Sequence, residues 1–317
     1  MMTESMKAAR IHQYGGPDVL VYEDAPRPSP AEGEVLVKVQ AVGINPVDWK
    51  TRAGSGMGGR YGSNPFPLII GWDIAGVVEA LGEKADKFKV GDEVFGMVRF
   101  PDIGAAYAEY VAAPQSHLAL KPANIDHIQA AAFPLVTLTA WQALFEAGDL
   151  SAGERLLIQG AAGGVGHIAV QLAKWKGAYV IATGSTNNMS FLRELGADAV
   201  IDYTNTRFED TIKAVDMVLG CIGGDMLTRS LWVIKTGGRL ISITGKPDQR
   251  EADKRHIRTD AILVRPVESH LSEIAKLIED GTLKTVVTQT FSLADAGKAH
   301  AFAESRELRR GKIVLTV

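Results

Sequence analysis

A glycine-rich stretch between an apolar run and an amphipathic segment is the strongest chemical signal in the sequence. It reads Gly160-Ala161-Ala162-Gly163-Gly164-Val165-Gly166 and directly follows the apolar residues 156–158. Such a turn lets a pyrophosphate approach the backbone without side chains in the way, and the first amides of the following helix hold the anion. Gly163 and Gly166 suit the approach of the anion and the packing of helix on strand, although Ala161 stands where the strict motif has glycine. The pattern predicts a dinucleotide site, with a ligand-free glycine turn as the alternative.

The end of the next apolar run bears on the choice between NAD and NADP. An NAD site usually has an acidic residue there, about 20 positions after the glycines, to bind the ribose hydroxyls. Residues 183–188 read Thr-Gly-Ser-Thr-Asn-Asn and contain no carboxylate. A 2′-phosphate would meet no repulsion and would find hydroxyl and amide donors. Because a neutral loop does not neutralise a phosphate, we expect a cation from elsewhere in the chain, and we favour NADPH.

Short apolar runs alternate with helical segments around this turn. The expected strands are residues 156–158, 179–182, 199–201, 215–219 and 240–243. A helix follows the glycine turn, and a second one, at 190–195, ends at Gly196. Strands that alternate with helices at this spacing predict a doubly wound parallel sheet, the Rossmann fold.

The flanking segments have other patterns. Residues 7–111 consist of short β-like runs broken by glycine and proline, with strands expected at 35–42, 73–80, 92–98 and 108–112. After Pro266 we expect a helix at 269–279, a strand at 285–290, a helix at 293–303 and a strand at 312–317. The chain therefore combines a mostly β domain, a Rossmann domain and a tail that is more than another βα unit. The glycine-rich loop at 54–59 suits either a surface loop or a flap over a pocket.

Composition narrows the class of protein. The net charge of −3 implies no basic face for nucleic acid, and 46% hydrophobic residues fit a soluble globular chain. Polar residues interrupt the uncharged stretch 128–145, so we expect a buried helical segment and no membrane span. The single cysteine, Cys221, excludes an intrachain disulfide and fits a cytoplasmic protein.

Four strings together resemble the medium-chain dehydrogenase/reductase superfamily. They are residues 41–48 (Ala-Val-Gly-Ile-Asn-Pro-Val-Asp), residues 71–78 (Gly-Trp-Asp-Ile-Ala-Gly-Val-Val), Leu138-Thr139-Ala140 and the glycine turn. Within the superfamily the chain is similar to the zinc-free quinone oxidoreductase branch, which includes NADPH-dependent alkenal reductases. The resemblance implies an α/β protein with a GroES-like catalytic domain at 1–125, a Rossmann NADP-binding domain at 126–265 and a return to the catalytic domain at 266–317. It also implies an active site in the cleft between the domains.

The zinc ligands of related enzymes are missing. Zinc-dependent relatives have a cysteine where this chain has Asn45, a His-Glu pair where it has Trp72-Asp73, and a further lobe with four cysteines. One cysteine cannot build either site in its usual form, and the seven histidines are scattered, so we expect no metal. Without a Lewis acid, alcohol oxidation is disfavoured, whereas quinones, enals and enones spread the transferred charge onto oxygen. The resemblance points to the same small-molecule substrates.

The resemblance also implies roles for single residues. The resemblance implies that Asn45 and Thr139 contact the nicotinamide side of the cofactor. It also implies that Gly163, Gly164 and Val165, together with Gly160, hold the pyrophosphate. For the 2′-phosphate the resemblance implies Ser185, Tyr203 and Arg306, beside Gly184, and Arg306 would be the cation. Related sequences often have Lys or Arg in the loop itself, and this chain does not. Cys221 would lie near the nicotinamide ribose, or be a small buried hydrophobe. The substrate pocket would contain Asn45, Asp48, Tyr61 and Trp72, with a structural acceptor as the alternative role of Asp48.

Two other functions stay open at this point. The chain could bind NADPH as a sensor or structural protein with little catalysis, and a zinc alcohol dehydrogenase is the weaker enzymatic alternative. The sequence leaves open the proton donor, the physiological substrate and assembly as a homodimer.

Overall fold

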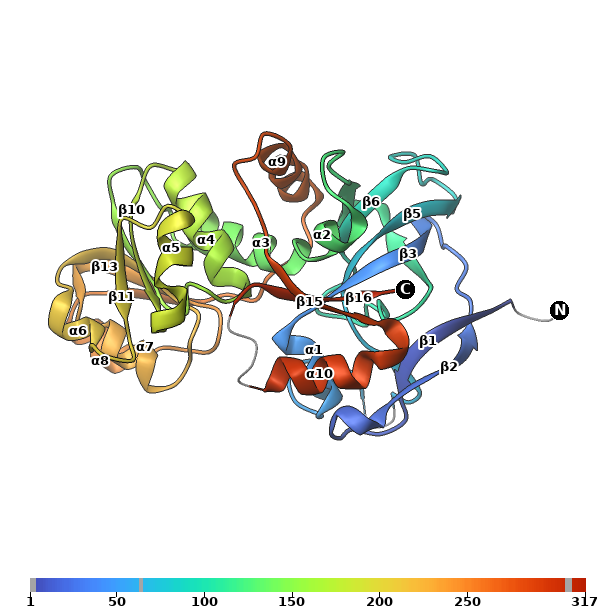
Figure 1. The fold of residues 1–317 in the computed structure, drawn as a ribbon, viewed down its shortest axis with the longest axis horizontal. Helices are drawn as coiled ribbons and strands as arrows, with labels where there is room; N and C mark the ends of the chain where they lie inside the picture. The colour runs from blue at the N-terminus through green and yellow to red at the C-terminus, as the bar shows by residue number, and fades with distance from the viewer. Residues whose placement is uncertain (1–3, 63–64, 306–309) are drawn as a thin grey trace. The chain divides into compact units, whose positions relative to one another are not determined.

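The computed structural model describes residues 4–62, 65–305 and 310–317, and the chain forms two compact units (Figure 1). The first unit comprises Met1–Leu135, Arg265–Gly281 and Thr285–Val317. The second comprises Val136–Val264 and Thr282–Lys284.

The first unit is built on two sheets. The larger has the order β15-β16-β3-β5-β6-β8, with β7 also paired to β3, and the smaller has the order β2-β1-β4. The strands of the larger sheet are β3 (Glu34–Ile44), β5 (Asp73–Leu81), β6 (Glu93–Met97), β7 (Tyr110–Pro114), β8 (Leu118–Leu120), β15 (Val287–Ser292) and β16 (Lys312–Thr316). Those of the smaller sheet are β1 (Ser5–Ile11), β2 (Leu20–Pro26) and β4 (Leu68–Ile69).

Within the described residues, four α-helices belong to this unit. They are α1 (Pro46–Arg52), α2 (His127–Ala131), α9 (Glu268–Glu279) and α10 (Ala296–Glu304). Helix α1 begins directly after β3 because Asn45 and Asp48 form a capping box and Pro46 is well suited to the first helical position. The expected mostly β domain is confirmed, and β16 lies beside β3 in its sheet.

The second unit is a parallel six-stranded sheet with the order β11-β10-β9-β12-β13-β14. Its strands are β9 (Arg155–Ile158), β10 (Tyr179–Gly184), β11 (Ala199–Asp202), β12 (Val215–Gly220), β13 (Ile234–Ser242) and β14 (Arg258–Ala261). Its helices are α3 (Pro134–Trp141), which begins in the first unit, α4 (Gly164–Trp175), α5 (Met189–Glu194), α6 (Phe208–Thr211), α7 (Asp225–Ser230) and α8 (Gln249–Lys254). Figure 1 shows α4 and α5 on the side of the sheet away from α6, α7 and α8, which is the layering of a doubly wound fold.

Some elements differ from the expectation. β14 was not predicted, because residues 258–261 are polar at three of four positions and lie at the sheet edge. β13 begins at Ile234, well before the expected residue 240, through a register shift opposite β12. The stretch 128–145 is helical as expected, in α2, α3 and the π-helix Gln142–Ala147. Across the described ranges, the helices are all too short or too polar to pass through a bilayer.

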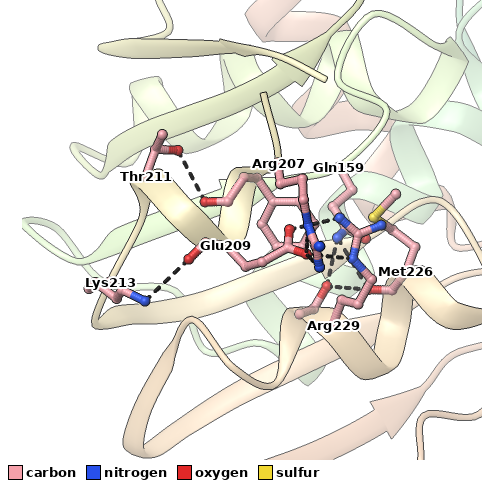
Figure 2. Close-up of polar contacts among 9 residues, drawn as sticks. Gln159, Arg207, Glu209, Thr211, Lys213, Met226 and Arg229 are labelled. Atoms are coloured by element: carbon pink, nitrogen blue, oxygen red, sulfur yellow. Dashed lines mark hydrogen bonds and ion pairs between the residues drawn. The ribbon is translucent and has the colours of Figure 1, made fainter. Parts of the chain in front are cut away.

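An ion-pair cluster joins α6 to α7 (Figure 2). The buried carboxylate of Glu209 accepts hydrogen bonds from Arg229 at 2.7 Å and from Arg207 at 2.8 Å. Next to it, the side chain of Gln159 donates to the hydroxyl of Ser230 at 2.6 Å. Gln159 directly precedes the glycine turn, so α7 holds the start of that turn in place.

Candidate functional site

The glycine turn has the backbone geometry that its sequence predicts. Gly160 has a φ of +60°, and Gly163 is the extended N-cap of α4. A Cβ atom on Gly166 would lie 2.4 Å from the carbonyl oxygen of Gly160, so only glycine lets the helix pack this close. A Cβ atom on Gly163 would meet no atom nearer than that oxygen, at 3.3 Å. The backbone beside Gly163 is therefore open to a ligand, and Gly164 and Val165 form the first turn of α4 next to it.

Neighbouring strands hold this turn at their carboxyl ends. The hydroxyl of Thr183, in β10, accepts from the amide of Gly160 at 3.3 Å, and the amide of Ala161 donates to the carbonyl of Thr183 at 3.0 Å. On the other side, the amide of Gln159 donates to the carbonyl of Leu219, in β12, at 3.1 Å. β9 therefore has β10 on one side and β12 on the other, which is the switch point where doubly wound sheets bind ligands. The role of Thr183 was not predicted, although a hydroxyl at the end of β10 was visible in the sequence.

Cys221 follows β12 and lies close to the turn. Its Cβ atom would be 3.8 Å from a Cβ atom built on Gly160. Burial raises the pKa of the Cys221 thiol to about 12. The thiol is therefore neutral at physiological pH and is not an activated nucleophile.

Three residues predicted to bind the cofactor lie at the end of β10. Gly184 is its last residue, and a Cβ atom there would lie 2.7 Å from the side chain of Leu192 in α5. Ser185 follows, with its hydroxyl accepting from Asn188 at 3.2 Å. The amide of Tyr203 donates to the carbonyl of Gly184 at 3.1 Å, and the Tyr203 side chain is exposed. Arg306, the predicted cation, lies outside the described residues.

A carboxylate that was not predicted stands beside this loop. Asp202 ends β11 and accepts from the hydroxyls of Thr186 and Thr204 at 2.6 Å each, and from the amide of Asn205 at 2.8 Å. Hydrogen bonds from Thr186 and Thr204 lower the pKa of Asp202, so it is ionised at neutral pH. The acidic residue of an NAD site usually ends the second strand of this sheet, whereas Asp202 ends the third.

A buried polar cluster occupies the first unit where β3 meets α1. We call it the Lys312 cluster: Asn45, Asp48, Asp73 and Lys312, all at most 3% exposed. The Asn45 side chain donates to Asp73 at 2.8 Å, and the Asn45 amide donates to Asp48 at 2.7 Å. The ammonium of Lys312 donates to the Asn45 side-chain oxygen at 2.5 Å.

The carboxylates of this cluster have shifted pKa values. Burial raises the pKa of Asp48 to about 7, and the neighbouring Asp73 adds to that rise. Burial also raises the pKa of Asp73 to about 6, against the opposing effect of the Lys312 ammonium. The desolvation of Lys312 lowers its pKa. Within Asp48, Oδ2 accepts two hydrogen bonds, whereas the buried Oδ1 has no hydrogen-bond partner among the described residues.

A directed chain of hydrogen bonds leads from Asp48 to α10. Arg52 can only donate, so its 3.0 Å contact with Nδ1 of His300 makes that nitrogen an acceptor and leaves the proton on Nε2. Nε2 then donates to the hydroxyl of Tyr107 at 2.8 Å, and Tyr107 donates to Asp48 at 3.1 Å. Burial lowers the pKa of His300 to about 3, in agreement with a neutral ring.

The other predicted pocket residues differ in accessibility. Trp72 is 1% exposed and its indole donates to the carbonyl of Asp102 at 2.7 Å. Tyr61 is half-buried, its hydroxyl donates to the carbonyl of Pro101 at 3.2 Å, and burial raises its pKa. Thr139 is buried in α3 of the second unit. The roles of these residues, like those of Asn45 and Asp48, stay predictions.

Comparisons with known proteins agree with this architecture. Residues 31–123 match the family model described as "Alcohol dehydrogenase GroES-like domain". Residues 195–315 match the model described as "Zinc-binding dehydrogenase". Across the part of the chain that the structure describes, no three His, Cys, Asp or Glu side chains are grouped so that they could hold a metal ion.

Individual relatives extend the match to nearly the whole chain. A quinone oxidoreductase from Sus scrofa is 32% identical over 98% of this chain and 97% of its own length. A chloroplastic NADPH-dependent alkenal/one oxidoreductase from Arabidopsis thaliana is 40% identical over 76% of this chain, which spans only 63% of that relative. The solved structure of the quinone oxidoreductase from Coxiella burnetii has a TM-score of 0.93 and 36% identity, over 99% of this chain and all of that one.

Proposed function

The chain belongs to the medium-chain dehydrogenase/reductase superfamily, and from that premise we propose that it is a zinc-independent, NADPH-dependent oxidoreductase that reduces quinones or α,β-unsaturated carbonyl compounds. The observation that carries the proposal is the open glycine turn at the switch point of the parallel sheet. The printed names of the quinone and alkenal/one oxidoreductases support this substrate class.

The described residues fit a dinucleotide. In the part of the chain that the structure describes, and apart from its chain neighbours, the only atom within 4 Å of a Cβ atom built on Gly163 is the carbonyl oxygen of Gly160. The first amides of α4, from Gly164 onward, lie next to this position. An anion is favoured at this helix end by the helix dipole and the unpaired amides. When bound there, NADPH supplies the hydride.

The described residues do not fit zinc. Asn45 uses its side-chain oxygen for the Lys312 ammonium. The indole of Trp72 has only a donor, which the carbonyl of Asp102 accepts. The positively charged Lys312 ammonium beside Asn45 also repels a dication. We therefore propose no step that uses a metal ion.

The protein residues would orient the substrate and exclude water. We propose Asn45, Asp48, Tyr61 and Trp72 for the substrate pocket. Among them, Tyr61 is the half-buried one, and its hydroxyl is a donor that could exchange the Pro101 carbonyl for a substrate oxygen. Such a donor stabilises the negative charge that develops on oxygen after hydride addition, and solvent can supply the proton.

The preference for NADPH over NADH is part of the proposal. It is supported by the absence of a carboxylate in residues 183–188 and by the donors of the Ser185 loop, with Arg306 as the proposed cation. The carboxylate of Asp202 beside the loop opposes it. We also propose that the protein is cytoplasmic, because its single cysteine fits a reducing compartment. A homodimer is one assembly that this proposal allows.

Oxidation of NADPH in the presence of a panel of quinones, enals and enones tests the function. We expect turnover with at least one class, in chelator as well as in buffer, and no turnover for Gly163→Val. Binding of NADPH without turnover of any compound would support the sensor alternative. Loss of turnover on chelation, with one zinc per chain by metal analysis, would contradict the zinc-independent mechanism.

A further inference from the structure

Lys312 is a buried lysine that the proposed reduction does not yet use. It is the first residue of β16 and is 3% exposed. β16 pairs antiparallel with β3, and Ile313 lies opposite Ile44. This register brings Lys312 to the end of β3, next to Asn45.

The ammonium group determines how the Asn45 carboxamide is oriented. It donates to the carbonyl of Ile44 at 2.7 Å and to the carboxamide oxygen of Asn45 at 2.5 Å. The carboxamide nitrogen donates to Asp73 at 2.8 Å. Turning the carboxamide over would place its NH₂ group against the ammonium and its oxygen against the carboxylate, so one orientation is strongly favoured.

Stability alone does not explain a charge at this position. Burying an ammonium group costs free energy that its partners only partly offset, and apolar side chains of similar volume are often as stabilising as a buried ion pair. The nearest carboxylate oxygen, Oδ2 of Asp73, is 3.9 Å from Nζ, which is an ion pair without close hydrogen-bond contact. A methionine could fill the same space without the desolvation cost.

The residues that Lys312 contacts indicate a role for its charge. By the resemblance, Asn45 aligns with the cysteine and Asp73 with the glutamate of the His-Glu pair of zinc-dependent relatives. In this chain Lys312 donates to Asn45 and forms an ion pair with Asp73. The positive charge at this place is thus supplied by the protein itself.

We propose that Lys312 is a positioning residue for the reduction, whose ammonium group supplies the charge in place of a metal and holds the Asn45 carboxamide in one orientation. The inference rests on the proposed function, since Lys312 acts through Asn45, which we place on the nicotinamide side of the site.

A double-mutant cycle tests the proposal. The variants are Lys312→Met, Asn45→Ala and the two combined, with Lys298→Met as the control because Lys298 is exposed and pairs only locally with Asp295. We expect Lys312→Met to lower kcat by about tenfold or more with KM changed less than about threefold, and the combined variant to be no worse than the poorer single variant. Losses that multiply, or a wild-type kcat for Lys312→Met, would overturn the proposal.

A second variant separates positioning from charge balance. Lys312→Met leaves the Asp73 carboxylate without its counter-charge, which can destabilise the fold, whereas Lys312→Met with Asp73→Asn removes both charges. We expect this pair to regain the stability of the wild type and to keep the low kcat. Recovery of the full kcat would mean that Lys312 is only a counter-ion, and the proposal would fail.

Hydrogen exchange of the Asn45 carboxamide gives a measurement that does not depend on turnover. In protein labelled with [¹⁵N]asparagine, we expect the Asn45 NH₂ protons to exchange faster in Lys312→Met than in the wild type and in Lys298→Met. Equal exchange rates would overturn the positioning role. If the wild type reduces no compound of the panel, the proposed function fails, and this measurement still decides whether Lys312 holds Asn45.

Discussion

The hydroxyl group of Thr186 donates a 2.6 Å hydrogen bond to the carboxylate of Asp202, across the gap between the ends of β10 and β11. The loop at 183–188 contains no acidic residue, but the carboxylate of Asp202 lies beside it in the folded chain. Like charges oppose each other, so Asp202 would weaken the binding of a 2′-phosphate at the proposed site near Ser185. In our proposal, the choice between NADPH and NADH then depends on the balance of this carboxylate against the donors of the loop.

Removal of that carboxylate should shift the balance toward NADPH. For Asp202→Asn we expect NADPH to bind about three- to tenfold more tightly and NADH to change little, because only NADPH carries the 2′-phosphate. Calorimetric titration of both cofactors measures this. Asp210→Asn removes an equal charge from α6 and serves as the control. An equal change for the two cofactors would show that Asp202 does not face the phosphate.

Substitutions at two glycines of the same turn should have different effects, one on stability and the other on cofactor binding. Gly166→Ala places a Cβ atom 2.4 Å from a backbone oxygen, so we expect a loss of about 1 to 3 kcal/mol in the free energy of unfolding. Gly163→Val meets only one backbone oxygen, at 3.3 Å from Cβ, so we expect it to stay folded and to lose cofactor binding. Urea denaturation and NADPH titration of both variants measure the two effects. Normal NADPH binding by Gly163→Val would place the cofactor elsewhere.

The carboxylate of Glu209 should stabilise the second unit at neutral pH and lose this effect in acid. Hydrogen bonds from Arg229 are the main cause that lowers its pKa to about 2, well below the ordinary value of 4.5. A lowered pKa in the folded state stabilises the protein above the unfolded-state pKa, and the effect disappears as the pH falls toward the folded-state pKa. We expect Glu209→Gln to cost about 2 kcal/mol at neutral pH. The difference in the free energy of unfolding between the wild type and Glu209→Gln should disappear as the pH falls from 4.5 toward about 2.

Denaturation of the wild type and of Glu209→Gln across this range tests that prediction. The exposed Glu194 provides a control, since Glu194→Gln should leave stability unchanged. A gap between the wild type and Glu209→Gln that does not depend on pH would mean that packing, and not charge, accounts for the role of Glu209.

Asp48 should have the opposite pH dependence. Its pKa is raised to about 7, so the folded protein retains a proton that the unfolded chain releases near 3.8. Stability therefore falls as the pH rises from about 4 to about 7, since the unfolded chain then binds fewer protons. Asp48→Asn cannot ionise and should lack this part of the decline. Urea midpoints compared at about pH 5 and about pH 8 measure the difference. Parallel pH profiles would contradict a protonated Asp48.

The elements that local sequence patterns determine could be predicted, and those that depend on distant partners could not. The glycine turn and the strand end at Ile158 follow from an apolar run and turn chemistry within a short window. Lys312 stands at the start of an apolar run, where a lone lysine suggests a solvent-exposed strand end. Its burial depends on Asn45 and Ile44, which lie far away in the sequence. Asp202 was missed for a related reason, because the pairing of β10 with β11 brings its carboxylate to Thr186.

The place of β16 in its sheet affects the order in which the chain can fold during synthesis. Lys312 bonds to Ile44 across 268 positions of sequence, and β16 is the direct neighbour of β3. All of Val136–Val264, the main segment of the second unit, leaves the ribosome before β16 is made. The second unit can therefore complete its sheet while the edge of β3 at residues 41–44 still lacks its pairing strand. This unpaired strand edge is a place where a chaperone would bind the nascent chain. If the ribosome stalled at this stage, the exposed strand could aggregate.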